Sequence, residues 1–214
     1  MKWQLLPAAQ LAQPPPAEWA HRSTIIVMPC TDADQARQAA QLMCSRAGVA
    51  DALLLVVLDD ARQGFIHIAN QVFNATTSTW FGYVAQDAFA GRQWLSTGVQ
   101  TLMQKDKGLL AFNDGKWGGA LAAFGLGRRT WLSQNYDGQL FYPGYTQHYA
   151  DTELTVIAIG NAQYCYNPQA VLVEVDWGKD TKSVNALDKV LFSQRKTGWL
   201  KTRIKDATCL EIFK

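Results

Sequence analysis

Tyr-Val-Ala-Gln-Asp-Ala-Phe-Ala-Gly, at residues 83–91, combines a short apolar run with one acid and a turn. The pattern indicates a buried strand that ends at Asp87 and is followed by a helix that begins near Arg92. In open α/β sheets, ligands bind in the crevice beyond the carboxyl ends of the strands. Mg²⁺ and Mn²⁺ prefer a few carboxylates together with phosphate oxygens. Asp87 is therefore a candidate metal ligand against a diphosphate, and an ordinary helix cap is the alternative.

The composition is that of a single globular domain. The chain has 214 residues, of which 48% are hydrophobic and 18% are charged, and its net charge is +2. This charge is too small to indicate nucleic-acid binding, and no Lys/Arg run supports such binding. The longest apolar runs, such as residues 53–58, are much shorter than a transmembrane helix requires. No signal peptide is visible and the four cysteines are scattered, so we expect a cytoplasmic protein with reduced thiols.

Apolar periodicity predicts alternating strands and helices along most of the chain. Strands are expected at residues 23–29, 52–58, 80–84 and 109–112, with one or two more in 164–175. Helices are expected at residues 32–46, 64–75, 92–104 and 151–159. A strand, a helix and a strand at this spacing indicate parallel pairing with a right-handed crossover. The expected fold class is therefore α/β, with a mostly parallel central sheet flanked by helices.

Three parts of the chain are distinguished by their sequence. Residues 1–22 read as an N-terminal extension, whose three prolines at 14–16 form a stiff connector. Residues 23–178 form the main domain. Residues 179–214 are expected to be an amphipathic helix and a tail packed on the same domain. The apolar face of that helix, over residues 180–195, is expected to consist of Val184, Leu187, Val190 and Leu191.

Four of these pieces resemble, in this order, a nucleotide-sugar glycosyltransferase of the GT-A fold, and most closely the inverting family-2 type. The first is the Pro-x-x-Asp end of a strand at residues 29–32, and the second is the acidic pair at 59–60. The third is the Tyr-x-x-x-Asp strand at 83–87. The last is residues 149–154, which resemble the family's Glu-Asp-x-Glu-Leu segment. The resemblance covers residues 23–178.

The resemblance implies a donor site for a nucleotide-diphosphate sugar. The loop after the first strand and one member of the acidic pair would hold the base and the ribose. Their carboxylates can accept hydrogen bonds from an imide N–H and from hydroxyls. The residues assigned to the donor are Pro29, Thr31, Asp32, Asp59, Asp60, Asn70 and Gln86.

The resemblance also implies the chemistry. Asp87 matches the metal-holding acid, which would bind Mn²⁺ or Mg²⁺ against the diphosphate. Asp151 matches the catalytic base, which removes the proton of an acceptor hydroxyl as that hydroxyl attacks the anomeric carbon. At the start of a helix, Asp151 is expected to stay ionised. The implied function is metal-dependent sugar transfer with inversion, in bacterial surface polysaccharide or other glycan synthesis. The expected acceptor is a glycan or is lipid-linked, with peripheral membrane association as one option.

Departures from the family's pattern leave two alternatives open. Ala85 and Gln86 stand where the family carries a first acid, Ala150 stands in place of the glutamate before the base, and residues 174–177 lack a histidine. One alternative is a relative that binds nucleotide sugars without transferring them. The other is a sugar nucleotidyltransferase, although the loop at residues 29–32 has neither the glycine nor the lysine expected of that class.

Overall fold

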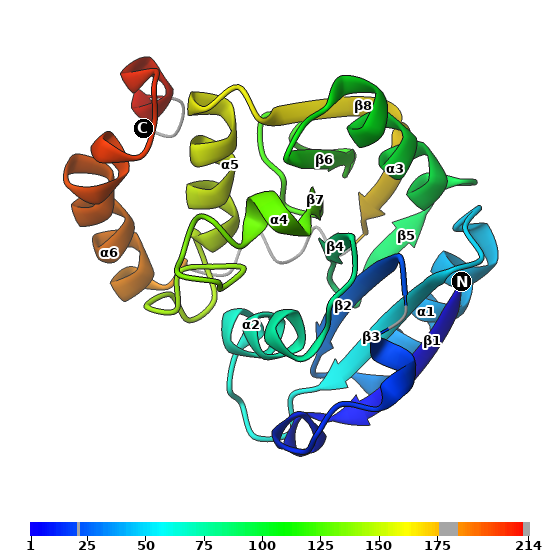
Figure 1. Cartoon of the computed structure of the whole chain (residues 1–214). Helices are drawn as coiled ribbons and strands as arrows, with labels where there is room; N and C mark the ends of the chain where they lie inside the picture. The colour runs from blue at the N-terminus through cyan, green and yellow to red at the C-terminus, as the bar shows by residue number, and fades with distance from the viewer. Residues whose placement is uncertain (21, 176–183, 212–214) are drawn as a thin grey trace.

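The computed structural model describes residues 1–20, 22–175 and 184–211. The chain folds into an eight-stranded sheet with helices on both faces (Figure 1). Helices α1 (Ala33–Arg46) and α3 (Trp94–Lys105) cover one face. Helices α2 (Phe65–Ala75) and α5 (Ala150–Gly160) cover the other. The helices α1, α2, α3 and α5 confirm the four that the sequence predicts.

The strands follow the order β1-β3-β2-β4-β7-β6-β8-β5 across the sheet. Their bounds are β1 Lys2–Pro7, β2 Thr24–Cys30, β3 Ala52–Leu58, β4 Trp80–Tyr83, β5 Ala88–Ala90, β6 Leu109–Asn113, β7 Gly125–Arg128 and β8 Tyr164–Glu174. β1, β3, β2 and β4 are parallel, and β6 is parallel to β8. β7 runs antiparallel to both β4 and β6, and β5 runs antiparallel to β8. The sheet is mixed, so the expectation of a mostly parallel sheet is wrong.

The two strands that break the parallel pattern have sequences that do not look like strands. β7 is Gly-Leu-Gly-Arg, and a side chain at Gly125 would lie 2.5 Å from the Tyr83 hydroxyl. β5 is three residues long and follows a turn in which the Ala88 N–H donates to the Ala85 carbonyl. Contacts with distant segments determine the pairing of β5 and of β7, and local strand propensity contains no information about such contacts.

The parallel strands β2 and β3 show why their sequences are almost continuously apolar. Ile25 and Val27 belong to the core beneath α2 and α5, whereas Ile26 and Met28 belong to the core beneath α1 and α3. Successive side chains of a strand point to opposite faces, and both faces are covered here. Every residue of β2 is consequently buried.

The first residues of the chain contribute to the sheet. β1 pairs in parallel with β3, with Lys2 opposite Leu53 and Pro7 opposite Leu58. The segment that we expected to be an extension therefore begins with the edge strand of the sheet. The prolines at 14–16 lie between two short 3₁₀ helices, η1 (Ala8–Ala12) and η2 (Ala17–Trp19).

The C-terminal helix packs differently from the prediction. α6 spans Ala186–Thr197 and is followed by η4 (Trp199–Thr202) and η5 (Ala207–Glu211). Leu187 is 79% exposed and Val190 is 55% exposed, whereas Asp188 and Phe192 are buried. The predicted apolar face is therefore wrong for Val184, Leu187 and Val190, whereas Leu191 does pack against the core. The other contacts of α6 are a buried carboxylate, one aromatic ring and Arg195. The first residues predicted for this helix, up to 183, lie outside the described residues.

The short remaining helix is α4 (Arg129–Leu132), which directly follows β7. Among residues 1–20, 22–175 and 184–211, no helix has both the length and the apolar character needed to cross a bilayer.

Candidate functional site

A cleft of about 670 Å³ lies beyond the carboxyl ends of β4, β6 and β8. Tyr83 ends β4, Lys116 and Trp117 follow β6, and Glu174 ends β8. The loop before α5 contributes His148 and Tyr149, and the first turn of α5 contributes Asp151. The structure therefore places a cleft at the edge of the sheet where the sequence predicts ligand binding.

Asp151 is the only acid of the predicted site set that lines this cleft in the described part of the chain. Its Oδ1 accepts a hydrogen bond of 2.8 Å from the Thr152 N–H. Burial raises the pKa of the Asp151 carboxyl, against the lowering effect of that hydrogen bond and of nearby His148. Burial is thus the dominant influence on this carboxyl. A raised pKa makes the carboxylate a stronger base.

The loop that leads into Asp151 is held by a carboxylate of α6. The backbone N–H groups of Thr146, Gln147 and His148 donate to Asp188 at 2.9–3.0 Å. Burial alone would raise the pKa of Asp188, but these hydrogen bonds hold the pKa below its ordinary value. His148 is further fixed by the Asn185 N–H, which donates to its Nδ1 at 3.4 Å. The loop is thus anchored immediately before the candidate base.

The two predicted acids after β3 have different surroundings. Asp59 accepts hydrogen bonds from the N–H groups of Gln63 and Gly64, at 2.7 and 2.8 Å. It shapes the loop that starts α2, whose first residue Phe65 lines the cleft. Asp60 is exposed to solvent. Neither Asp59 nor Asp60 lines the cleft.

The loop after β2 is held by Gln86. Its Oε1 accepts from the Thr31 and Asp32 N–H groups, at 2.7 and 3.1 Å, and its Nε2 donates to the side chain of Gln35. Asp32 caps α1 by accepting from two N–H groups of its first turn. Pro29 lies inside β2, buried, opposite Val57. Gln86 therefore sets the position of the predicted base-binding loop, and Thr31 is exposed on it.

Asp87 lies in the turn between β4 and β5 and is 3% exposed. Its carbonyl accepts from the Val175 N–H, and the next residue, Ala88, pairs with Glu174. Glu174 lines the cleft, whereas Asp87 is not among the lining residues. In the described residues no group of three His, Cys, Asp or Glu side chains could hold a metal by itself. A metal that also took phosphate oxygens would need only one or two protein carboxylates.

Glu153 and the predicted donor residue Asn70 both serve the core. Asn70 is buried, and its side chain exchanges two hydrogen bonds, of 3.0 and 2.9 Å, with the backbone of Phe141. Phe141 lines the cleft, so Asn70 supports the site from behind. Glu153 is fully buried and binds both the Tyr145 hydroxyl and the Arg195 guanidinium. Glu153 therefore links α5 to α6.

Lys116 and Asp188 are site residues that the sequence argument did not identify. Lys116 lies in the loop of residues 115–119. The loop is fixed by Asp114, whose Oδ1 accepts from the Lys116 and Trp117 N–H groups. An acid directly before a glycine-rich loop was the available signal, because such acids commonly close turns. Asp188 gave no such signal, because an acid in a helix usually faces solvent.

Comparison with known proteins relates the chain to glycosyltransferases by structure. No family model matches it, and no curated protein matches it in sequence. A mannosyltransferase from Pyrobaculum calidifontis, PcManGT, in complex with GDP-Man and Mn²⁺, is similar at a TM-score of 0.53 and 16% identity, over 80% of this chain and 64% of that one. A Drosophila β1,4-galactosyltransferase 7 mutant, with manganese, UDP-Gal and xylobiose, has a TM-score of 0.56 and 14% identity, over 79% of each chain.

S. aureus TarS gives a TM-score of 0.58 at 10% identity, over 82% of this chain and 40% of that one. The chain therefore spans about two thirds of the mannosyltransferase and less than half of TarS. These likenesses show that the chain has the fold of these glycosyltransferases.

Proposed function

We propose that the chain is a glycosyltransferase that moves a sugar from a nucleotide-diphosphate donor to an acceptor hydroxyl, with inversion. The observation that carries the proposal is the position of Asp151. On a glycosyltransferase fold, this carboxyl lines the cleft beyond the strand ends and has a raised pKa. Perturbed carboxyls in such clefts are typical of acid–base catalysts.

In the proposed reaction, the acceptor oxygen attacks the anomeric carbon while Asp151 takes the hydroxyl proton. The bond between the anomeric carbon and the diphosphate oxygen breaks, and its electron pair goes to the diphosphate. Attack from the face opposite the leaving group inverts the configuration. Lys116, which also lines the cleft, would neutralise part of the growing negative charge.

Asp87 and Glu174 are the proposed ligands of a divalent metal, with the donor's phosphates completing the coordination. A bound Mn²⁺ or Mg²⁺ would stabilise the charge of the leaving diphosphate. Manganese and the nucleotide sugars GDP-Man and UDP-Gal in two structural neighbours support this choice of cofactor and donor. The exposed Thr31, which Gln86 positions, would contact the nucleotide base.

The proposed acceptor is a glycan, free or lipid-linked, and xylobiose in one neighbour supports a sugar acceptor. We propose peripheral membrane contact for a lipid-linked acceptor through Val184, Leu187 and Val190, which are exposed, with Val184 lining the cleft. Sedimentation with anionic vesicles tests the membrane contact, and the double variant Leu187→Ser, Val190→Ser should no longer sediment with the vesicles.

A cytoplasmic location is proposed because all four cysteines are free thiols. A role in surface polysaccharide or other glycan synthesis follows from this acceptor class.

Donor binding can be tested by calorimetry with UDP- and GDP-sugars, with and without Mn²⁺. The proposal expects binding that Mn²⁺ tightens in the wild type and no longer tightens in Asp87→Asn or Glu174→Gln. Asp137→Asn is the matched control, because Asp137 is exposed in a loop remote from the cleft lining. Absence of binding to any nucleotide sugar would overturn the proposal. Binding without transfer would instead favour a relative that binds nucleotide sugars without transferring them. That alternative rests on Ala85 and Ala150, which stand where the family has acidic residues.

A further inference from the structure

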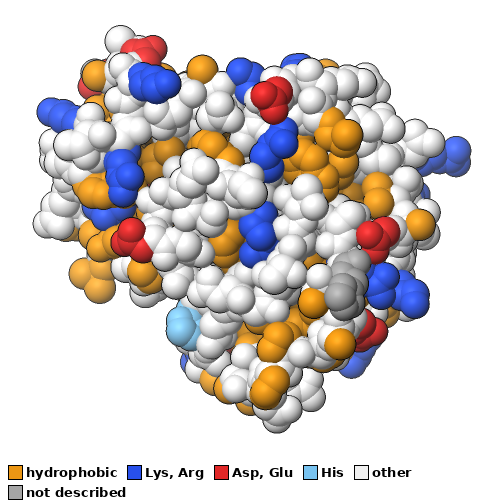
Figure 2. All heavy atoms as spheres, viewed as in Figure 1, with side chains coloured by type: hydrophobic (Ala, Val, Ile, Leu, Met, Phe, Trp, Pro, Cys, Tyr) orange, Lys and Arg blue, Asp and Glu red, His pale blue; other side chains and the backbone are white. Residues whose placement is uncertain are grey.

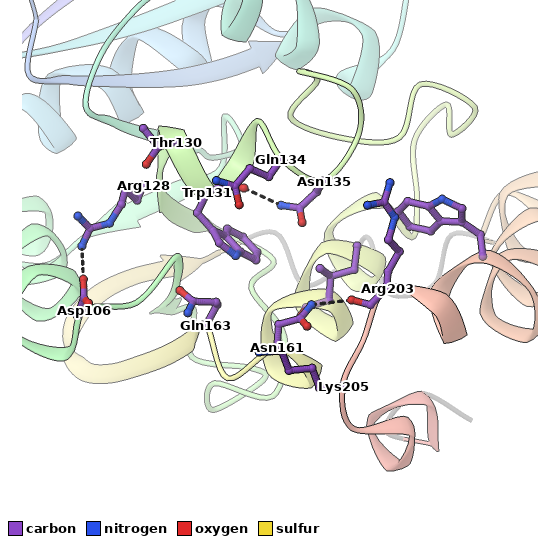
Figure 3. A pocket seen from close by; sticks show the side chains of 12 residues that line it. Asp106, Arg128, Thr130, Trp131, Gln134, Asn135, Asn161, Gln163, Arg203 and Lys205 are labelled. Carbon is purple, nitrogen blue, oxygen red and sulfur yellow. Dashed lines mark hydrogen bonds and ion pairs between the residues drawn. The ribbon is translucent and has the colours of Figure 1, made fainter.

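A second hollow, of about 560 Å³, is lined by residues that precede β6 and β8, at the opposite ends of these strands from the cleft. Figure 3 shows this hollow from close by. Arg128 at the end of β7, Gln163 before β8 and Asn161 at the end of α5 line it. Trp131 from α4 and Arg203 after η4 complete the wall. These segments come from distant parts of the chain, so the hollow is built by the tertiary fold.

Trp131 provides a fixed aromatic surface inside this hollow. Its ring lies over Gly108, where an added Cβ would be 2.3 Å from Cδ2 of the indole. The Asn135 side chain donates to the Trp131 carbonyl at 3.0 Å and fixes the short helix that carries it. The indole projects into the hollow between Gln163 and Arg203 (Figure 3). Only a backbone as bare as that of Gly108 allows this packing.

The polar groups around Trp131 have more donors than acceptors. Asp106 is the sole acid of the lining, and it is already paired with Arg128 at 2.9 Å. The guanidinium of Arg203 lies 4.9 Å from the centre of the Trp199 ring. Within the described residues, neither Arg203 nor Lys205 has a carboxylate partner. A negatively charged ligand with many hydrogen-bond acceptors would match these donors and cations.

The two cations are held in place by their backbone. Asn161 donates to the Arg203 carbonyl at 2.9 Å, and the Lys205 N–H donates to the Gly160 carbonyl at 3.0 Å. The end of α5 therefore fixes where both side chains start, which lowers the ordering cost of binding a ligand. In Figure 2, which has the view of Figure 1, Lys and Arg side chains are spread over the region where Figure 1 shows the C-terminal helices.

We propose that this hollow binds an acidic saccharide. The apolar face of a sugar ring packs on Trp131, its carboxylate or phosphate group binds Arg203 and Lys205, and Gln163 binds ring hydroxyls. Asp151 and Asn161 lie at opposite ends of α5, about 15 Å apart along the helix axis. A saccharide in the hollow is thus close enough to belong to a longer acceptor chain. That role rests on the proposed function, whereas the binding does not.

The binding can be measured by NMR on ¹⁵N-labelled full-length protein through the indole N–H signals of its tryptophans. The probes are trigalacturonate for the carboxylate source, glucose 6-phosphate for the phosphate source, cellotriose as the neutral saccharide and inorganic phosphate alone. We expect one of the acidic saccharides to shift the Trp131 indole signal, with cellotriose weaker. Inorganic phosphate should shift the backbone signals of residues 203–205 without the indole.

Arg203→Ala with Lys205→Ala should weaken the acidic saccharide at least about tenfold. Both side chains are exposed, so this variant should fold, and Lys189→Ala is the control for loss of an exposed cation. Equal affinity in the double variant, or no Trp131 shift with any acidic saccharide, would overturn the proposal. Titration of the same sample with UDP and GDP plus Mn²⁺ reports on Lys116 and His148, so a failure of donor binding is seen separately.

Discussion

The Asp188 carboxylate accepts a hydrogen bond of 2.9 Å from the His148 backbone N–H, three residues before the proposed base. Two more N–H groups of the same loop donate to it, so one carboxylate of α6 satisfies three consecutive donors. The position of Asp151 therefore depends on a helix that follows it in the chain and touches no proposed substrate. Asp188 acts through the loop, as a positioning residue.

Asp188→Asn should raise the acceptor KM and lower kcat while leaving donor affinity unchanged, because only the loop before Asp151 is loosened. Hydrogen bonds to a charged group contribute about 1.5–3 kcal/mol each, so a stability loss on this order is also expected. Kinetics with varied acceptor, together with urea unfolding, measure both effects. Lys189→Ala, at the exposed neighbouring position, should change neither. Wild-type acceptor kinetics in Asp188→Asn would contradict the positioning role.

The same carboxylate predicts a pH dependence of stability. Its pKa is lowered in the folded state, so its contribution is fully present above the ordinary Asp pKa of about 3.9. The contribution is lost as the pH falls from that value through the lower folded-state pKa. The free energy of unfolding of Asp188→Asn, measured against pH, should therefore approach that of the wild type in acid. A constant difference across the acid range would contradict the assignment.

The sequence predicts the inner parallel strands β2, β3 and β4 and the major helices well, because their apolar patterns reflect burial on one or both faces. The parallel edge strand β1 is not predicted. The sequence also does not predict β7, whose Gly125 and Gly127 are required by close neighbours and not by strand propensity. It also misreads α6, where Leu187 faces solvent and Asp188 faces the loop. The apolar pattern of a helix does not predict that an acidic residue will be buried against the backbone of a distant loop.

The candidate site was predictable in part for a similar reason. Acids at strand ends identify the correct edge of the sheet, and Asp151 does line the cleft. Asp59, Asn70 and Gln86 each bind backbone groups, which a sequence cannot distinguish from groups of a ligand. Which polar residue faces the cleft is decided by the tertiary fold.

The ion pair between Glu153 and Arg195 joins α5 to α6, and the glutamate is fully buried. Removing one partner leaves an uncompensated buried charge, which costs about 3–5 kcal/mol. Arg195→Ala should therefore lose stability on this order in chemical denaturation. Glu153→Leu combined with Arg195→Met should recover most of it, since no charge remains unpaired. A loss below about 1 kcal/mol in Arg195→Ala would show that the pair is not a principal link between the helices.

The raised pKa of Asp151 predicts the acid limb of the pH–rate profile. A base works only when it is deprotonated, so kcat should fall as the pH drops through this pKa. Because burial raises the pKa, the decline should begin above the pH expected for an ordinary Asp of pKa about 3.9. The profile of kcat between about pH 4 and pH 9 checks this. A rate that stays constant down to about pH 4 would place the base elsewhere.

Turnover of Asp151→Asn tests the central claim most directly. Asparagine keeps the size of the side chain and cannot accept the proton of the acceptor hydroxyl. The measurement is nucleotide release from a UDP- or GDP-sugar with a panel of oligosaccharide acceptors, alongside calorimetric donor affinity. We predict a loss of at least about a hundredfold in turnover, with donor affinity unchanged and with Asp137→Asn indistinguishable from the wild type. Sugar transfer by Asp151→Asn at the wild-type rate would contradict the account.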